Sequence, residues 1–166
     1  MRLIDPLLME FDREASTTRK LLERCPDSKL GWQPHPKSMT LGKLATHLAT
    51  IPSMVASSVL KDGLDLATVA PTPPLGTTAE ILGAFDAACG GAKAAMAQLD
   101  DARALASWTL SRDGVTLLSM PRIAFLRTIL LNHSIHHRGQ LSVYLRLLDV
   151  PVPAIYGRSA DENPFG

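Results

Sequence analysis

The chain has 166 residues, 46% of them hydrophobic and 20% charged, and its formal net charge is +1. These values exclude a disordered chain, and the length predicts one domain over residues 1–166. Acidic and basic residues are interspersed, which argues against binding to nucleic acid. No apolar run is long enough to cross a membrane, and the acidic residues within positions 1–13 are unlike a secretory signal. We therefore expect a cytoplasmic protein with no membrane partner.

The first half of the chain predicts two long helices. Apolar residues recur at helical spacing over residues 3–24, and Pro26 ends this helix because a proline disfavours helical backbone in the residue before it. A second helix begins after Ser38 or Thr40, either of which can cap it, and runs to about residue 60. Pro52 lies inside this helix and is expected to kink or loosen it. The two apolar stripes are Leu3, Leu7, Phe11, Ala15, Thr18 and Leu22, and then Leu44, His47, Ile51 and Met54.

A third helix is predicted across the middle of the chain, after a long Pro/Gly-rich loop over residues 61–77. It starts near Thr77, which has the spacing of a capping box with Glu80. Gly90 and Gly91 lie inside this helix and suggest close approach to a neighbouring helix, since glycine is otherwise unfavourable there.

A second long connection and a fourth helix complete the chain. Within residues 100–120, two short extended pieces surround an Asp113-Gly114 pair that is typical of a turn. The fourth helix opens with Pro121 and runs to about residue 148. Its apolar stripe contains Ile123, Leu126, Leu130, His133, His137, Leu141, Tyr144 and Leu148.

His133 and His137 occupy the centre of that stripe, and residues four apart lie on the same face of a helix. A buried imidazole whose donor or acceptor is unpaired costs about 1–3 kcal/mol for each such group. Binding both rings to one metal ion satisfies an acceptor nitrogen of each. His47, on the inward stripe of the second helix, could supply a third nitrogen from across the protein. The sequence therefore predicts a metal site formed by His47, His133 and His137, against the alternative of ordinary core histidines.

Three neutral nitrogens without a thiolate suit Zn, Ni or another borderline divalent ion. Cys25 and Cys89 form no close-spaced pair, so they suggest neither a thiolate site nor a disulfide framework. Three protein ligands also leave room for a water molecule or a substrate, which is the catalytic pattern. Ser134 stands where the HExxH metalloprotease motif has its glutamate, and no other carboxylate is an evident general base.

The two remaining histidines are not expected to be ligands. His136 lies about 100° around the helix from His137 and leaves the core stripe, so it is assigned to a helix flank, an interface or the surroundings of the site. His35 stands between two prolines and is expected to be exposed in a loop.

The pattern resembles the DinB family (DinB/YfiT-like) of metal-binding four-helix bundles. The likeness spans nearly the whole chain and is carried by the Trp32-Gln33-Pro34 loop, the Leu44-Ala45-Thr46-His47-Leu48 segment, residues 133–147 and the tail over residues 150–162. The resemblance implies an all-α fold with up-up-down-down helices, a divalent ion held by His47, His133 and His137, and a homodimer.

The resemblance also implies three functional hypotheses. The first is a thiol-dependent S-transferase in which the metal activates a low-molecular-weight thiol that attacks a small-molecule electrophile. The second is a metal-dependent hydrolase that uses metal-bound water, and the third is a non-enzymatic metal-binding stress or interaction protein. Five further residues are candidates for contacts to a ligand or substrate, although surface, packing or tail-anchoring roles are favoured for each: Arg138, Gln140, Tyr144, Tyr156 and Arg158.

Overall fold

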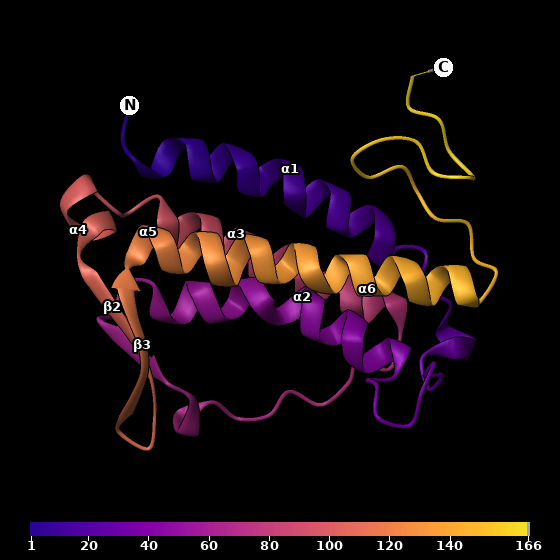
Figure 1. Cartoon of the computed structure of the whole chain (residues 1–166), viewed down its shortest axis with the longest axis horizontal. Helices are drawn as coiled ribbons and strands as arrows, with labels where there is room; N and C mark the ends of the chain where they lie inside the picture. The colour runs from indigo at the N-terminus through magenta and orange to yellow at the C-terminus, as the bar shows by residue number, and fades with distance from the viewer. Residues whose placement is uncertain (166) are drawn as a thin grey trace.

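The computed structural model of the chain describes residues 1–165, and helices dominate it (Figure 1). Four long helical segments lie side by side, as the apolar periodicity predicts. They are α1 (Ile4–Leu22), α2 (Leu41–Ser58), α3 (Thr78–Met96) and a continuous last segment made of α5 (Arg122–Phe125), the π-helix η3 (Leu126–Asn132) and α6 (His133–Leu147). Shorter helical pieces are η1 (Asp27–Lys29), η2 (Leu66–Thr68) and α4 (Asp101–Leu105).

The order of helix directions differs from the expected up-up-down-down arrangement. The α1 and α5–α6 segments run one way, whereas α2 and α3 run the other way (Figure 1). Arg2, before α1, donates to the carbonyl of Ala97 after α3, so these two helices are antiparallel. Tyr144, near the end of α6, donates to the carbonyl of Met39 before α2. The prediction is wrong because residues 23–40 reverse the chain, while the Pro-rich crossover after α2 returns it to the start of α3.

Two local contacts show how closely α2 and α3 pack as parallel neighbours. The backbone N–H of Leu75, just before α3, donates to Thr46 Oγ1 near the start of α2 at 2.9 Å. Further along, a Cβ on Gly91 would lie 3.2 Å from the Cβ of Ala56. Glycine at this position therefore permits the close approach that the sequence suggests, whereas a Cβ on Gly90 would meet nothing within 4 Å.

A small sheet accompanies the helices, so the all-α prediction is incomplete. Strands β1 (Gly63–Asp65), β2 (Ser107–Arg112) and β3 (Val115–Pro121) lie in the order β1-β2-β3, with β1 parallel and β3 antiparallel to β2. The predicted extended pieces and the Asp113-Gly114 turn are confirmed as the β2–β3 hairpin, with φ of 52° and 76° at the turn. Strand β1 escaped prediction because three residues are too few to show an alternating pattern.

The side chains that the sequence offers as caps are found at the N-terminal ends of α2 and α3. Thr40 caps α2 by accepting from the N–H of Lys43 at 3.2 Å. Thr77 and Glu80 form the predicted capping box at α3. Helix α2 continues through Pro52.

No helix within residues 1–165 is both long and apolar enough to cross a membrane.

The predicted apolar stripes line the core, except at the start of the first one, and the last helical segment contains an unpredicted π-helix. Leu3 is 42% exposed, and Ile4, at the first position of α1, is buried in its place. In the last segment, seven residues form a π-helix, which has more residues per turn than an α-helix and shifts the faces that follow it. This irregular stretch ends directly before His133, and π-helical turns are frequent at functional sites.

Candidate metal centre

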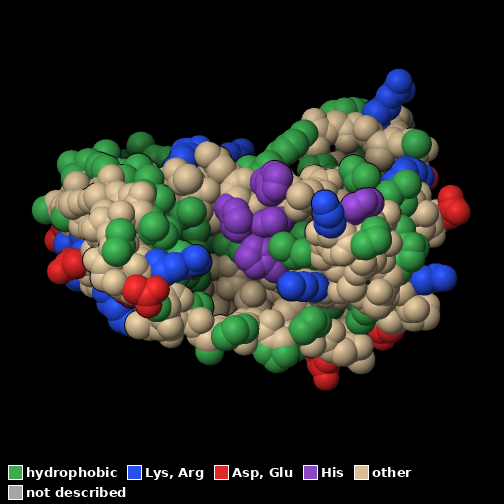
Figure 2. All heavy atoms as spheres, turned by 60° about the horizontal axis from the view of Figure 1, so that its bottom comes forward, with side chains coloured by type: hydrophobic (Ala, Val, Ile, Leu, Met, Phe, Trp, Pro, Cys, Tyr) green, Lys and Arg blue, Asp and Glu red, His purple; other side chains and the backbone are tan. Residues whose placement is uncertain are grey.

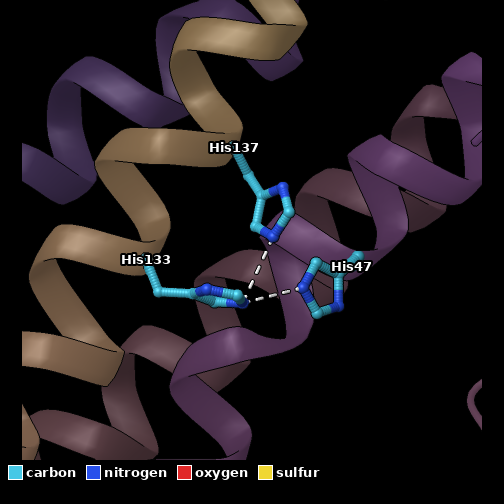
Figure 3. Close-up of side chains that lie close together, drawn as sticks. All are labelled: His47, His133 and His137. Carbon is cyan, nitrogen blue, oxygen red and sulfur yellow. Dashed lines mark hydrogen bonds between the residues drawn. The ribbon is translucent and has the colours of Figure 1, made fainter. Parts of the chain in front are cut away.

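His47 of α2 meets His133 and His137 of α6, with all three side chains pointing toward one place (Figure 3). The Nε2 atom of His133 lies 3.1 Å from Nε2 of His47 and 3.2 Å from Nε2 of His137. One ligand atom from each ring can be chosen so that all lie within 4.8 Å of one another. The structure thus brings together the three histidines that the sequence selects; that they bind a metal stays a prediction.

The donor set is suited to a divalent ion. His137 Nδ1 lies 2.7 Å from Gln140 Oε1, so this nitrogen carries the ring proton and Nε2 presents a lone pair. His133 Nε2 faces two neighbouring nitrogens, and a single proton there cannot satisfy both. Zn–N bonds of about 2.0–2.1 Å in a tetrahedral arrangement require nitrogen separations of roughly 3.3–3.4 Å. The observed 3.1 and 3.2 Å are close to that requirement.

Burial keeps the three imidazoles neutral at neutral pH. It lowers the pKa of His47 and His137 and, together with the neighbouring histidines, lowers the pKa of His133 to about 4. The hydrogen bond that His137 Nδ1 donates to Gln140 Oε1 partly opposes this shift at His137. Neutral imidazole is the form that binds metal, so protons compete weakly for these nitrogens.

The metal-free protein is expected to lose stability as the pH falls from about 6.5 to about 5. Unfolded, the three histidines bind protons near their ordinary pKa of about 6.5. Folded, their lowered pKa values keep them neutral to lower pH. The unfolded state therefore binds more protons in this range, and the free energy of unfolding falls with the pH. Thermal unfolding of chelator-treated protein across this range measures the effect.

The matched variant for this experiment is His133→Leu, because the pKa of His133 is lowered to about 4. The unfolding temperature of this variant should change less with pH than that of the parent. Carboxylates do not explain such a difference, since their unfolded pKa values of about 4 lie below the range tested. An equal pH dependence of parent and variant would contradict the prediction.

The other histidines lie outside the cluster, as expected. His136 is exposed, with its ring centroid 5.0 Å from that of His137 in an edge-on arrangement. His35 is exposed in its loop, where Nδ1 accepts from the N–H of Lys37 at 3.1 Å. Within residues 1–165, no other group of at least three His, Cys, Asp or Glu side chains is arranged to hold a metal ion.

The sequence favours surface, packing or tail-anchoring roles for five further residues, and the structure agrees for three of them but not for Gln140 and Arg138. Gln140 contacts a predicted ligand directly, through His137 Nδ1, and is more than a packing residue. Arg138 is 1% exposed rather than a surface charge, and its guanidinium lies 2.6 Å from the Glu14 carboxylate. Tyr156 contacts both members of this ion pair and so anchors the tail as expected. The two remaining residues behave as predicted: Tyr144 packs edge-on against Trp32, and Arg158 is exposed.

A cavity of about 810 Å³ borders the histidine cluster, and His47 and His133 form part of its wall. Figure 2 shows histidine side chains gathered at the edge of a hollow in the surface. The rest of the wall comes from Met39 and α2, from the crossover between α2 and α3 over residues 64–74, from strand β2 and from the last helical segment. Such a size is typical of small-molecule sites. The sequence did not reveal this cavity, because its wall is assembled from segments far apart in the chain and carries no local motif.

Comparison with known proteins identifies relatives of the whole chain. A family model described as the DinB superfamily matches residues 10–141. The uncharacterized protein YrdA of Bacillus subtilis (strain 168) is 28% identical over 165 residues, covering 96% of this chain and 91% of that protein.

Two solved structures share the fold. A DinB-like protein from Bacillus cereus ATCC 10987 superimposes with a TM-score of 0.72 at 25% identity, covering 90% of this chain and 95% of that chain. The DinB-like protein YjoA from Bacillus subtilis has the same TM-score of 0.72 at 18% identity, covering 93% of this chain and 100% of that chain. The second likeness supports the fold alone.

Proposed function

The chain belongs to the DinB superfamily, and we propose that it binds one divalent ion, Zn or Ni, through His47, His133 and His137. The observation that carries this proposal is the convergence of three imidazole nitrogens at the wall of a cavity large enough for a small molecule. Structural zinc sites usually have four protein ligands, whereas three ligands beside an open space are the catalytic pattern. An ion held there would lower the pKa of a bound thiol or water molecule and supply a nucleophile at neutral pH.

We propose that the nucleophile is a low-molecular-weight thiol from outside the protein, which makes the protein a thiol-dependent S-transferase. Its own thiols are unsuited to the role. Cys25 and Cys89 are buried, and burial raises the pKa of each to about 12. Neither contributes to the wall of the cavity beside His47. Because a reactive cysteine needs an accessible, low-pKa thiol, the attacking thiol is not supplied by this chain.

The alternative of a metal-dependent hydrolase is less well supported by the cavity. Attack by water is commonly assisted by a carboxylate or histidine that accepts its proton. No Asp or Glu lies in the described wall of the cavity, and both histidines there belong to the cluster. A non-enzymatic alternative also has structural support, because an ion in the cluster would join α2 to α6.

An assay with two electrophiles separates these functions. Protein loaded with Zn or Ni is incubated with 1-chloro-2,4-dinitrobenzene, with and without cysteine, glutathione or coenzyme A, and separately with 4-nitrophenyl acetate. The proposal predicts S-conjugation that requires both metal and thiol. Metal-dependent ester cleavage without thiol would instead assign a hydrolase. No activity in either assay, alongside a large fall in melting temperature on chelation, would assign a structural ion.

Gln140 is expected to strengthen metal binding without contacting the ion. Its Oε1 accepts from Nδ1 of His137 at 2.7 Å, which fixes the ring and directs Nε2 toward the cluster. Loss of such a partner typically lowers metal affinity about 10–100-fold. Competition titration of Gln140→Ala with a chromogenic chelator measures this change. Gln98→Ala is the matched control, since within residues 1–165 that amide bonds only the carbonyl of Ala94 at the end of α3, and the affinity of this variant should equal that of the parent.

The proposal extends to the helical scaffold and to the oligomeric state of the protein. We propose that the four long segments constitute the four-helix bundle of DinB/YfiT-like proteins, and that the protein is a cytoplasmic homodimer without nucleic-acid or membrane partners. Exposed apolar side chains on α6, Val143 and Leu147, are consistent with a subunit contact there. Light scattering coupled to size-exclusion chromatography tests the dimer, and a monomer at micromolar concentration would contradict it.

A further inference from the structure

We propose that the cavity beside the histidine cluster takes an organic carboxylate, whose apolar body lies in the cavity and whose negative charge is attracted by Lys43 and Arg112 on its wall. This inference names the substrate class of the proposed function and rests on the cavity being the substrate site. It is carried by the charges and surfaces of the wall rather than by the metal.

Lys43 places one positive charge close to the cluster. It lies one helical turn before His47, and residues at this spacing share a face of the helix. Its side chain lines the cavity and has no ion-pair partner within residues 1–165, although its backbone N–H is used by the Thr40 cap. The ammonium group therefore has its full charge available to a ligand.

Arg112 places a second positive charge on another part of the wall. It is the last residue of β2, beside the Asp113-Gly114 turn, and its side chain also lacks an ion-pair partner in the described chain. The neighbouring carboxylate of Asp65 is already engaged, because it accepts the backbone N–H groups of Ala67, Asp113 and Gly114. Arg112 is thus available for a carboxylate brought by a ligand, for which a guanidinium has matching geometry.

The rest of the wall selects against cations and strongly polar molecules. None of the described wall residues is Asp or Glu, so the wall itself carries no negative charge beside the positive charges of Lys43 and Arg112. Figure 2 shows Lys or Arg side chains on both sides of the histidine group. Most remaining wall residues are apolar, and Phe125 among them stacks on the buried Trp108 at 3.8 Å between ring centroids. A flat apolar body with one anionic end suits this combination.

A ligand series tests the assignment in metal-free protein. The probes are 4-phenylbutyrate, its neutral amide and the corresponding phosphonate, followed by NMR titration of the labelled backbone. We expect the carboxylate to bind about tenfold more tightly than the amide, and to shift signals from residues of the cavity wall. Lys43→Gln and Arg112→Gln should each weaken carboxylate binding about three- to tenfold, as expected for single partly exposed charged contacts. The amide should bind all variants equally.

Matched controls are Lys20→Gln and Arg13→Gln, which remove exposed charges on α1 away from the cavity and should leave every affinity unchanged. Equal binding of carboxylate and amide, or equal carboxylate binding by parent and both cavity variants, would overturn the proposal. Tighter binding of the phosphonate would overturn the carboxylate assignment in favour of a phosphate-bearing ligand. Because these titrations contain no metal, their outcome is independent of whether the histidine cluster proves to bind an ion.

Discussion

Alanine in place of His133 is expected to abolish stoichiometric metal binding. The parent should contain about one Zn or Ni per chain, because neutral nitrogens converge there at the spacing of ligands. His133 Nε2 lies within 3.2 Å of the corresponding atoms of both His47 and His137, so its removal leaves only two ligands. The loss of affinity should exceed the roughly 10–100-fold that follows loss of a ligand's hydrogen-bond partner. Elemental analysis after dialysis measures the metal content directly.

His136→Ala is the matched control for this experiment. It removes a neighbouring imidazole of the same helix that is exposed and outside the cluster, so its metal content should equal that of the parent. His47→Ala extends the test to α2 and should behave like His133→Ala. Full metal content in His47→Ala would refute the three-ligand site, and loss of metal in His136→Ala would place the ion elsewhere.

Chelation supplies an independent measurement of the same site. An ion that binds the folded but not the unfolded chain stabilises it by about 4 kcal/mol when its concentration is a thousandfold above the dissociation constant. For a chain of this size, that corresponds to a shift in melting temperature on the order of 10 °C. The parent and His136→Ala should lose this increment on addition of chelator, whereas His133→Ala should have none to lose.

Helical periodicity identified both helices that carry the cluster, but it did not predict how the helices are connected. The spacing of His133 and His137, and the position of His47 on an apolar stripe, were sufficient to select the three residues that meet in the structure. Helix direction was mispredicted because long connections permit either orientation, and the choice depends on contacts such as that of Thr78 with the Cys25 carbonyl. Such contacts join distant residues and leave no periodic signal.

Buried charges were the second feature that sequence reasoning missed. Arginine is usually exposed, so patterns of hydrophobicity assign Arg122 and Arg138 to the surface. In the structure they are 2% and 1% exposed, because their guanidinium groups bind oxygen atoms that would otherwise be unsatisfied. The local sequence does not contain these oxygen atoms, which belong to other helices and loops.

Arg122 joins the two helical segments that carry the histidines. It lies at the first position of α5, and its Nε donates to the carbonyl of Val59 at the end of α2 at 3.1 Å. Nη2 donates to the carbonyl of Lys61 at 2.9 Å and pairs with the carboxylate of Asp62. The side chain of Asp62 is 99% exposed, whereas that of Arg122 is 2% exposed. The carbonyls bound by the buried guanidinium, and not the exposed carboxylate, should therefore account for most of the stabilisation.

Replacing Arg122 by methionine is expected to lower the free energy of unfolding by about 3–5 kcal/mol, since it leaves the carbonyls around the buried guanidinium without this donor. Asp62→Asn is the matched variant and should cost less than about 1 kcal/mol, because an exposed ion pair contributes little. Urea unfolding of metal-free proteins measures both values without interference from the ion. Similar losses in the two variants would show that the ion pair carries the interaction. The predicted difference would instead show that the backbone carbonyls after α2, and not the ion pair, carry the interaction by which Arg122 joins α2 to the last helical segment.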